Sequence, residues 1–313
     1  MTDSMNIFEL PEFKEHDMFD FPGEMERVTS GKGGEAIMIF TGEKALLYDC
    51  GMAYCGPKTV ENIRKALASR KKADGGSYDL DYILVSHTHY DHIGALPLVL
   101  DAFPDAKVVG SEKGQYIFTR PGARKVIKGL GETARDQYDP GSTMEIPGEG
   151  FRIDITLKDG ESIDVGGGLK LIALETKGHT DCAMAYVFEP LSVMFASEST
   201  GVLERGIVNT PILKNYDDSI VSVEKCRAYD AEYVIVPHYG LLPKSFNQQY
   251  WDTFIKNAKE KRELVKGWYE EGLSDEEVLA KYTDVYWDES AAKAQPKEAF
   301  IMNAKNIVKV LGA

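Results

Sequence analysis

The stretch that most restricts what this chain can fold into is "ILVSHTHYDHIGALPL", residues 83–98. Three histidines and one aspartate lie within six residues, directly after an apolar run. The apolar run predicts a buried strand, and loops at strand ends are where a rigid sheet positions functional groups. The fold must therefore present several imidazoles together at the end of a buried strand.

The other histidines repeat this placement. His179 follows an apolar stretch in "LETKGHTDCA", and His238 closes another in "VIVPHYG". Only His16, alone in an acidic N-terminal segment, stands apart, and we expect no site role for it. The H-x-H-x-D-H spacing, joined to two more strand-end histidines, favours a metal site over a set of unrelated core or surface residues.

The chemistry of metal ligands explains the spacing. His87 and His89 are two residues apart, so in an extended turn they point to one side and can bind one cation. Asp91 and His92 continue into a helix start and can bind a second cation. Imidazole nitrogen and carboxylate oxygen are donors that zinc accepts at about 2.0–2.2 Å. Two such ions roughly 3.5–4 Å apart can share a hydroxide and hold a substrate oxygen.

Strand and helix patterns alternate along the chain, which indicates an α/β fold. We expect one main domain over residues 1–243, with a cap-like insertion at about 111–150, and a C-terminal helical extension over 244–313. Strands are predicted within 35–51, 78–86, 106–111, 151–157, 161–165, 169–176, 183–189, 191–197 and 233–237, and helices at 58–72, 92–103, 219–229, 251–272 and 296–311.

Composition excludes several classes of protein. A net charge of −14 argues against a nucleic-acid partner, because phosphate binding depends on clustered Lys and Arg. No run approaches the roughly 18 apolar residues of a membrane span, and the acidic N-terminus does not resemble a signal peptide. The four cysteines lack zinc-ribbon spacing and are expected to be reduced thiols, with Cys50 and Cys55 inert. We therefore expect a cytoplasmic protein.

The motif "HTHYDHIG" resembles the signature of the metallo-β-lactamase superfamily, and the resemblance covers about residues 30–240 in order. It implies a four-layer αββα sandwich that holds one or two metal ions between its sheets, here with added C-terminal helices. In "LLYDCG" it gives Asp49 a supporting role. It implies that His87, His89 and His179 bind the first metal, that Asp91, His92 and His238 bind the second, and that Glu198 lies between them.

The chain departs from the family pattern at three positions. The bridging residue is usually aspartate, whereas Glu198 has an extra methylene, so it either bridges differently or binds one metal only. The last histidine usually follows a glycine, but His238 follows Pro237, which changes its reach. Lys177 replaces a frequent proline, and we interpret this as a neutral surface change.

The resemblance implies a metal-dependent hydrolase of a small-molecule ester, thioester, lactone or phosphoester. A metal-bound hydroxide would attack, and Asp91 would help to move the proton. The expected cofactors are two divalent ions, zinc by default with iron and manganese as alternatives. We expect a small-molecule substrate and no nucleic-acid or membrane partner, and the C-terminal helices are compatible with a homodimer.

Two other functions stay open at this point. The first is oxidoreduction at non-haem iron; flavodiiron proteins resemble this fold, but they place a glutamate where this chain has His89 and add a flavodoxin domain. The second is a ligand-binding or regulatory protein on the same scaffold, with Glu198 marking weakened catalysis. The basic side chains of Arg120, Arg124, Lys125 and Lys128 are expected to form a solvated face.

Overall fold

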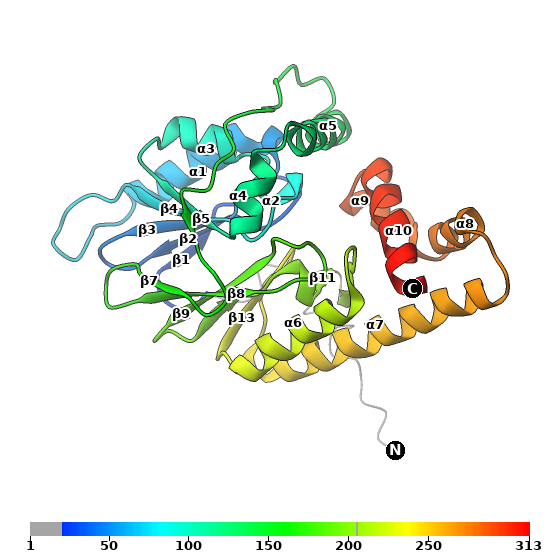
Figure 1. The fold of residues 1–313 in the computed structure, drawn as a ribbon. Helices are drawn as coiled ribbons and strands as arrows, with labels where there is room; N and C mark the ends of the chain where they lie inside the picture. The colour runs from blue at the N-terminus through cyan, green and yellow to red at the C-terminus, as the bar shows by residue number, and fades with distance from the viewer. Residues whose placement is uncertain (1–20, 205) are drawn as a thin grey trace.

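A pair of facing β-sheets forms the centre of the computed structural model, which describes residues 21–204 and 206–313 (Figure 1). Each sheet contains six strands. The first has the order β1 (Met25–Arg27), β2 (Ile37–Phe40), β3 (Ala45–Tyr48), β4 (Leu80–Leu84), β5 (Lys107–Gly110), β6 (Ile155–Thr156). The second has the order β14 (Gly240–Leu241), β13 (Tyr233–Val236), β10 (Val193–Phe195), β9 (Met184–Glu189), β8 (Lys170–Glu175), β7 (Ser162–Asp164).

Strands β2 and β3 of the first sheet are apolar throughout and fully buried, as expected for strands that are covered on both faces. In β2, Ile37 and Ile39 point into the core between the sheets, whereas Met38 and Phe40 pack under the outer helices. This alternation follows from the two-residue period of a strand. The inter-sheet core consequently forms from one face of each sheet.

Helices cover the outer face of both sheets, which gives four layers (Figure 1). The expected αββα sandwich is confirmed. Over the first sheet lie α1 (Gly56–Ala68), α2 (Tyr90–Ile93), α3 (Leu96–Ala102), α4 (Glu112–Phe118) and α5 (Pro121–Tyr138), and over the second lie α6 (Tyr216–Tyr229) and α7 (Asn247–Glu270). None of the described helices is long and apolar enough to cross a membrane.

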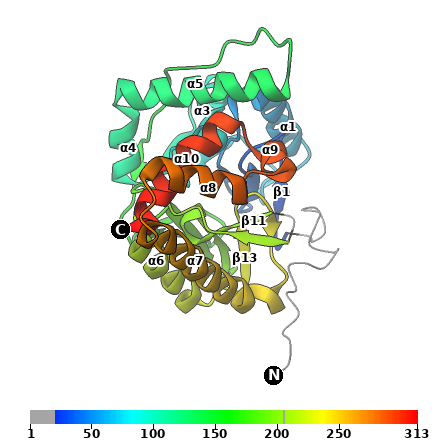
Figure 2. The ribbon, with the colours of Figure 1, turned by 90° about the vertical axis from the view of Figure 1, so that its right-hand side faces the viewer.

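The C-terminal helices pack on the second half and reach across to the first. They are α7, α8 (Asp275–Tyr286), α9 (Glu289–Ala294) and α10 (Lys297–Gly312). Phe300 and Leu311 of α10 belong to the core on the outer face of the second sheet, whereas Ala299 also packs against the first-half core. Figure 2 shows α8, α9 and α10 in front of the edge of the sandwich, below α5. The domain division at residues 243/244 stays a prediction.

Some local predictions were wrong. The single helix expected over 92–103 is two helices, α2 and α3, because the Ala95 amide donates to the Gly51 carbonyl at 3.0 Å and so leaves the helical pattern after Gly94. The helix expected over 58–72 ends at Ala68. The sequence analysis also missed β1, β14 and a hairpin of β11 (Val202–Glu204) and β12 (Ile207–Asn209), whose strands are only two or three residues long.

Gly178 lies in the turn after β8, directly before the predicted ligand His179, so its backbone conformation sets the position of that ligand. Its φ is +127°, and an added Cβ would lie 2.6 Å from Ser219 Cα. We predict that Gly178→Ala lowers the free energy of unfolding by more than about 1 kcal/mol, because both the backbone and α6 must shift.

The matched control for this variant is Gly129→Ala within α5, where an added Cβ meets nothing within 4 Å and φ is not positive. It should raise the free energy of unfolding by about 0.5–1 kcal/mol. Urea titration of both variants measures these changes; equal effects would contradict this account of Gly178.

Candidate metal centre

The predicted ligands come from one edge of the sandwich, where several strands end. His87 and His89 follow β4, His179 follows β8, Glu198 follows β10 and His238 follows β13. Strands β8, β10 and β13 run in the same direction, because β9 is antiparallel to both β8 and β10, and β10 is parallel to β13. The topology thus brings residues that are 150 positions apart to the same place.

Hydrogen bonds between the sheets fix the loop after β4 against the second sheet. The Tyr186 hydroxyl donates to the Val85 carbonyl at 2.8 Å, and the Met184 amide donates to the Ser86 carbonyl at 2.8 Å. His87 follows directly, with its side chain buried. The first motif is therefore held in position from both sheets.

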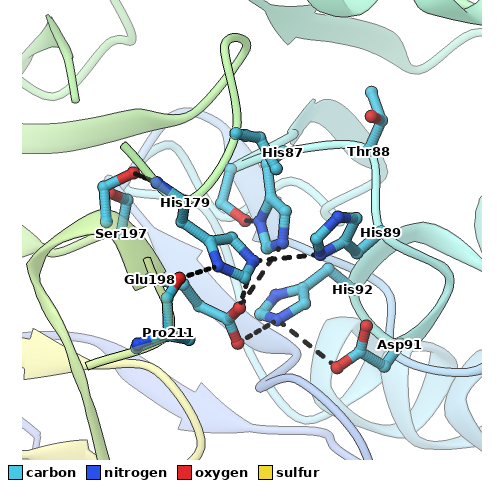
Figure 3. A network of polar contacts seen from close by, with 12 residues as sticks. His87, Thr88, His89, Asp91, His92, His179, Ser197, Glu198 and Pro211 are labelled. Atoms are coloured by element: carbon cyan, nitrogen blue, oxygen red, sulfur yellow. Dashed lines mark hydrogen bonds and ion pairs between the residues drawn. The ribbon is translucent and has the colours of Figure 1, made fainter. Parts of the chain in front are cut away.

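All seven predicted ligands lie together, in two groups that share one carboxylate. Figure 3 labels six of them, all except His238. Within each group the candidate donor atoms lie within 4.8 Å of one another. The first group contains His87, His89, His179 and Glu198, and the second contains Asp91, His92, Glu198 and His238. Their assignment as ligands stays a prediction, and His16 lies outside the described residues.

The two oxygens of Glu198 face different groups. Glu198 Oε2 is 2.6 Å from His179 Nε2 and 3.7 Å from His87 Nε2. Glu198 Oε1 is 3.1 Å from His92 Nε2 and also contacts His238 Nε2. The longer side chain of glutamate therefore does not prevent contact with both groups, and the geometry fits a carboxylate shared between two cations.

Outer partners turn one nitrogen of several histidines toward the centre. His179 Nδ1 donates to the Pro211 carbonyl at 2.7 Å, and His92 Nδ1 donates to Asp49 Oδ2 at 2.8 Å. A carbonyl or carboxylate only accepts, so a neutral ring here presents an unprotonated Nε2 inward. With neutral rings the inward nitrogens and the Glu198 oxygens would all be acceptors, so the arrangement needs a proton or a metal cation between them.

His87 gives an independent indication of a cation. Its Nδ1 lies 3.0 Å from the Ser86 hydroxyl, whose proton goes to Asp49 Oδ2 at 2.6 Å. Its Nε2 is buried and lacks a hydrogen-bond partner within the described part of the chain. Buried polar atoms without a partner are rare, and this one points at three other candidate donors. The donor set fits divalent metal ions.

The electrostatics of the site divide the histidines into two kinds. Burial lowers the pKa of His89 to about 4, and burial together with the fields of His92 and His89 holds the pKa of His87 well below its usual value. Burial opposes a charge on His92 and His238 too, but the neighbouring carboxylates Asp91 and Glu198 outweigh it and raise both pKa values.

Glu198 responds in the opposite direction. Burial alone would raise its pKa, but the fields of His179, His238 and His92 together hold the pKa well below the ordinary value. The carboxylate is therefore ionised at neutral pH. Buried charges of this kind are retained only where they are paired or bind a metal.

Asp49, the predicted supporting residue, is fully buried beneath the second group. It accepts from the Ser86 amide at 2.8 Å, from the Ser86 hydroxyl and from His92 Nδ1. Burial raises its pKa, and the bonds from His92 and Ser86 offset part of that rise. Asp49 thus joins the ends of β3 and β4 and fixes the orientation of the His92 ring.

The residues that hold the second group of ligands from the N-terminal side were not predicted from the sequence. Arg27 forms an ion pair with Glu35 at 2.6 Å and donates from Nη2 to the Tyr239 carbonyl at 2.9 Å. Tyr239 follows His238, whose φ is +61°. Gly34 leaves room for the His92 ring, since an added Cβ would lie 2.5 Å from His92 Nδ1. The glycines of "GKGGEA" were the only signal for this packing.

The basic residues of the insertion do not join the site. Arg124 pairs with Glu149 at 2.9 Å and Lys128 with Glu132 at 2.9 Å, while Arg120 and Lys125 are exposed. These contacts agree with the solvated face expected from the sequence. They leave the charge of the centre to the histidines and carboxylates described above.

Comparison with known proteins gives a family match over most of the two sheets. A family model described as the metallo-beta-lactamase superfamily matches residues 31–238. The match ends at the last predicted ligand and leaves α7–α10 outside it. The structure of an archaeal metallo-beta-lactamase superfamily protein from Sulfolobus tokodaii has a TM-score of 0.55 at 19% identity, covering 74% of this chain and 86% of that one. This likeness shows the fold.

Two curated relatives are similar at low identity. The archaeal protein of that structure, a "Metallo-beta-lactamase fold-containing protein" of Sulfurisphaera tokodaii, is 26% identical over 208 residues, or 66% of this chain and 78% of that protein. An "Atrochrysone carboxyl ACP thioesterase" of Aspergillus fumigatus is 20% identical over 246 residues, or 78% of this chain. The chain spans 61% of the length of that thioesterase.

The two groups should differ in how metal binding depends on pH. The lowered pKa values leave His87 and His89 neutral near pH 7, whereas the raised pKa values let His92 and His238 keep a proton to higher pH. A metal must displace such protons. Affinity at the second group should therefore rise more steeply with pH than affinity at the first group. Calorimetry in two buffers of different ionisation enthalpy counts the protons; metal binding without proton release would contradict this division.

Arg27 should affect the second group selectively. Substitution Arg27→Gln removes the ion pair with Glu35 and weakens the hold on the Tyr239 carbonyl, so His238 loses its fixed position. We expect metal affinity at the second group to fall by about tenfold, the lower end for loss of an outer partner. Arg70→Gln, which breaks the exposed pairs of Arg70 with Glu24 and Glu26, is the control and should leave both affinities unchanged. Equal effects of the two variants would contradict the assignment.

Proposed function

Because the chain belongs to the metallo-beta-lactamase superfamily, we propose that it is a metal-dependent hydrolase of a small-molecule ester, thioester, lactone or phosphoester. The superfamily includes metallo-hydrolases such as thioesterases and β-lactamases. The observation that carries the proposal is the shared carboxylate of Glu198, with one oxygen toward each group of histidines. A paired site of this kind suits hydrolysis better than simple ligand storage.

Two divalent ions would be held by the groups described above, with zinc the default and iron or manganese as alternatives. When bound, such ions supply Lewis acidity and a nucleophile at neutral pH. His87, His89 and His179 would hold one ion, Asp91, His92 and His238 the other, and Glu198 both. The imidazoles can do this because their outer nitrogens are already bonded to Ser86, Pro211 and Asp49.

The exposure of the ligands indicates where a substrate enters. The side chains of His87, His92 and His179 are at most 3% exposed, whereas those of Asp91 and His238 are 19% and 24% exposed. A substrate would therefore approach from the side of Asp91 and His238. The buried histidines exclude water from the opposite side of the centre.

Asp91 is the residue best placed to move a proton during hydrolysis. Its Oδ2 lies 3.8 Å from His92 Nε2 and 3.7 Å from His238 Nε2, on the accessible side. From there Asp91 Oδ2 can accept a proton from the attacking water and deliver it to the leaving group. The same carboxylate is also a candidate ligand, so its two roles are joined in one side chain.

Chelation and reconstitution would test this proposal. Removal of metal should abolish hydrolysis in a panel of p-nitrophenyl esters, thioesters, lactones and phosphoesters, and zinc should restore it. His87→Ala and His89→Ala should each lower kcat by about 100-fold or more, because each removes a ligand. Tyr78→Phe, remote from the centre, is the control.

Two results would redirect the assignment. Oxygen uptake restored by iron alone, with no hydrolysis under zinc, would indicate the iron oxidoreductase. Metal binding without turnover of any compound in the panel would indicate a ligand-binding protein. Undiminished hydrolysis in His87→Ala and His89→Ala together would contradict metal-dependent chemistry altogether.

A further inference from the structure

Tyr138 carries a buried hydroxyl that is left without a partner in the part of the chain that the structure describes. It is the last residue of α5, in the insertion between the two halves. Its ring stacks on Tyr54 with the centroids 6.1 Å apart and packs against the first-half core. The hydroxyl oxygen has no hydrogen-bond partner among residues 21–204 and 206–313. Phenylalanine would fill the same space without leaving a buried donor unpaired, so packing alone does not explain the tyrosine.

Tyr138 lies on a helix that packs against one of the elements of the metal centre. Helix α5 packs against α2, the helix that carries Asp91 and His92. The charges of Asp91 and Glu204 both act on the Tyr138 phenol, and Tyr138 acts on Tyr90 next to Asp91. Glu204 ends β11, the first strand after Glu198. Tyr138 therefore stands within electrostatic reach of the accessible side of the centre and of the β11–β12 hairpin.

The C-terminal helices meet the insertion at the same point. Gln137, next to Tyr138, donates from Nε2 to the Ala292 carbonyl of α9 at 3.2 Å. Figure 2 shows α5 crossing above α9 and α10. The two regions outside the family's ligand motifs thus come together beside Asp91, on the side from which a substrate would approach.

The phenol can act only as a hydrogen-bond donor or a neutral acceptor here. Burial, helped by the charges of Asp91 and Glu204, raises the pKa of Tyr138 to about 12. It stays protonated at neutral pH, and the described residues offer no acceptor for its proton.

We propose that the Tyr138 hydroxyl donates a hydrogen bond to an oxygen of the substrate held at the metal centre, which makes Tyr138 a substrate-binding residue of the insertion. This assignment rests on the proposed function for the identity of the substrate. The chemistry that Tyr138 recognises is an anionic or strongly polarised oxygen, as in a carboxylate, a phosphoryl group or an ester carbonyl.

Calorimetric titration of inorganic phosphate into the zinc-loaded protein tests the proposal without requiring turnover. Tyr138→Phe should weaken phosphate binding by about tenfold, the loss expected for a hydrogen bond to a charged oxygen. In the absence of phosphate, the midpoint of thermal unfolding of Tyr138→Phe should equal or exceed that of the wild type, because the substitution removes no hydrogen bond within the described residues. Its zinc content should not change.

Tyr54→Phe is the matched control. The Tyr54 hydroxyl accepts from the Lys32 amide at 3.1 Å, so its loss should lower the midpoint of unfolding and leave phosphate binding unchanged. Equal phosphate affinity in Tyr138→Phe and the wild type would overturn the proposal, and so would a wild type that does not bind phosphate. An equal loss in Tyr54→Phe would overturn it too, since the effect would then come from packing.

The phosphate titration, together with the hydrolysis panel, tests the hydrolase activity and the role of Tyr138 separately. A protein that binds phosphate through Tyr138 but hydrolyses nothing contradicts the hydrolase and leaves the role of Tyr138 standing. A protein that hydrolyses a member of the panel equally well with Tyr138→Phe, and binds phosphate equally well, contradicts only the role of Tyr138.

Discussion

Glu198 is a buried carboxylate with imidazole nitrogens on both of its oxygens, and the rest of the structure depends on this arrangement. Burying a charge is expensive unless it is paired. His92 and His179 face Glu198, and their other ring nitrogens donate to Asp49 and to the Pro211 carbonyl. These outer hydrogen bonds fix the orientation of the two rings, and the rings in turn hold the Glu198 carboxylate in place.

The topology of the sandwich brings the partners of the buried Glu198 carboxylate together. Strand ends from both sheets meet at one edge, so the ligands come from the rigid termini of β4, β8, β10 and β13. Hydrogen bonds such as that from the Tyr186 hydroxyl to the Val85 carbonyl prevent the two sheets from shifting relative to each other. The insertion and the C-terminal helices pack around this edge, and the insertion carries Tyr138, the residue proposed to bind substrate.

Much of the site could be predicted from the sequence because its ligands lie in short motifs after apolar strands. The four-layer fold and the order of its main elements were predictable for the same reason. The Arg27 contact with the Tyr239 carbonyl was not, since it joins residues 212 positions apart and no local pattern marks it. The β11–β12 hairpin was missed because strands of two or three residues have no readable period. The break after Gly94 depends on the hydrogen bond from the Ala95 amide to the Gly51 carbonyl, which a sequence pattern does not report.

The most direct test of a carboxylate shared between two cations is the metal content per chain, measured by elemental mass spectrometry on protein purified without added metal or chelator. We expect two ions in the wild type and a fall toward one in Glu198→Ala, because the shared carboxylate contributes to both groups. A wild type that holds one ion or none after saturation with zinc, or a variant that keeps both, would contradict a shared carboxylate.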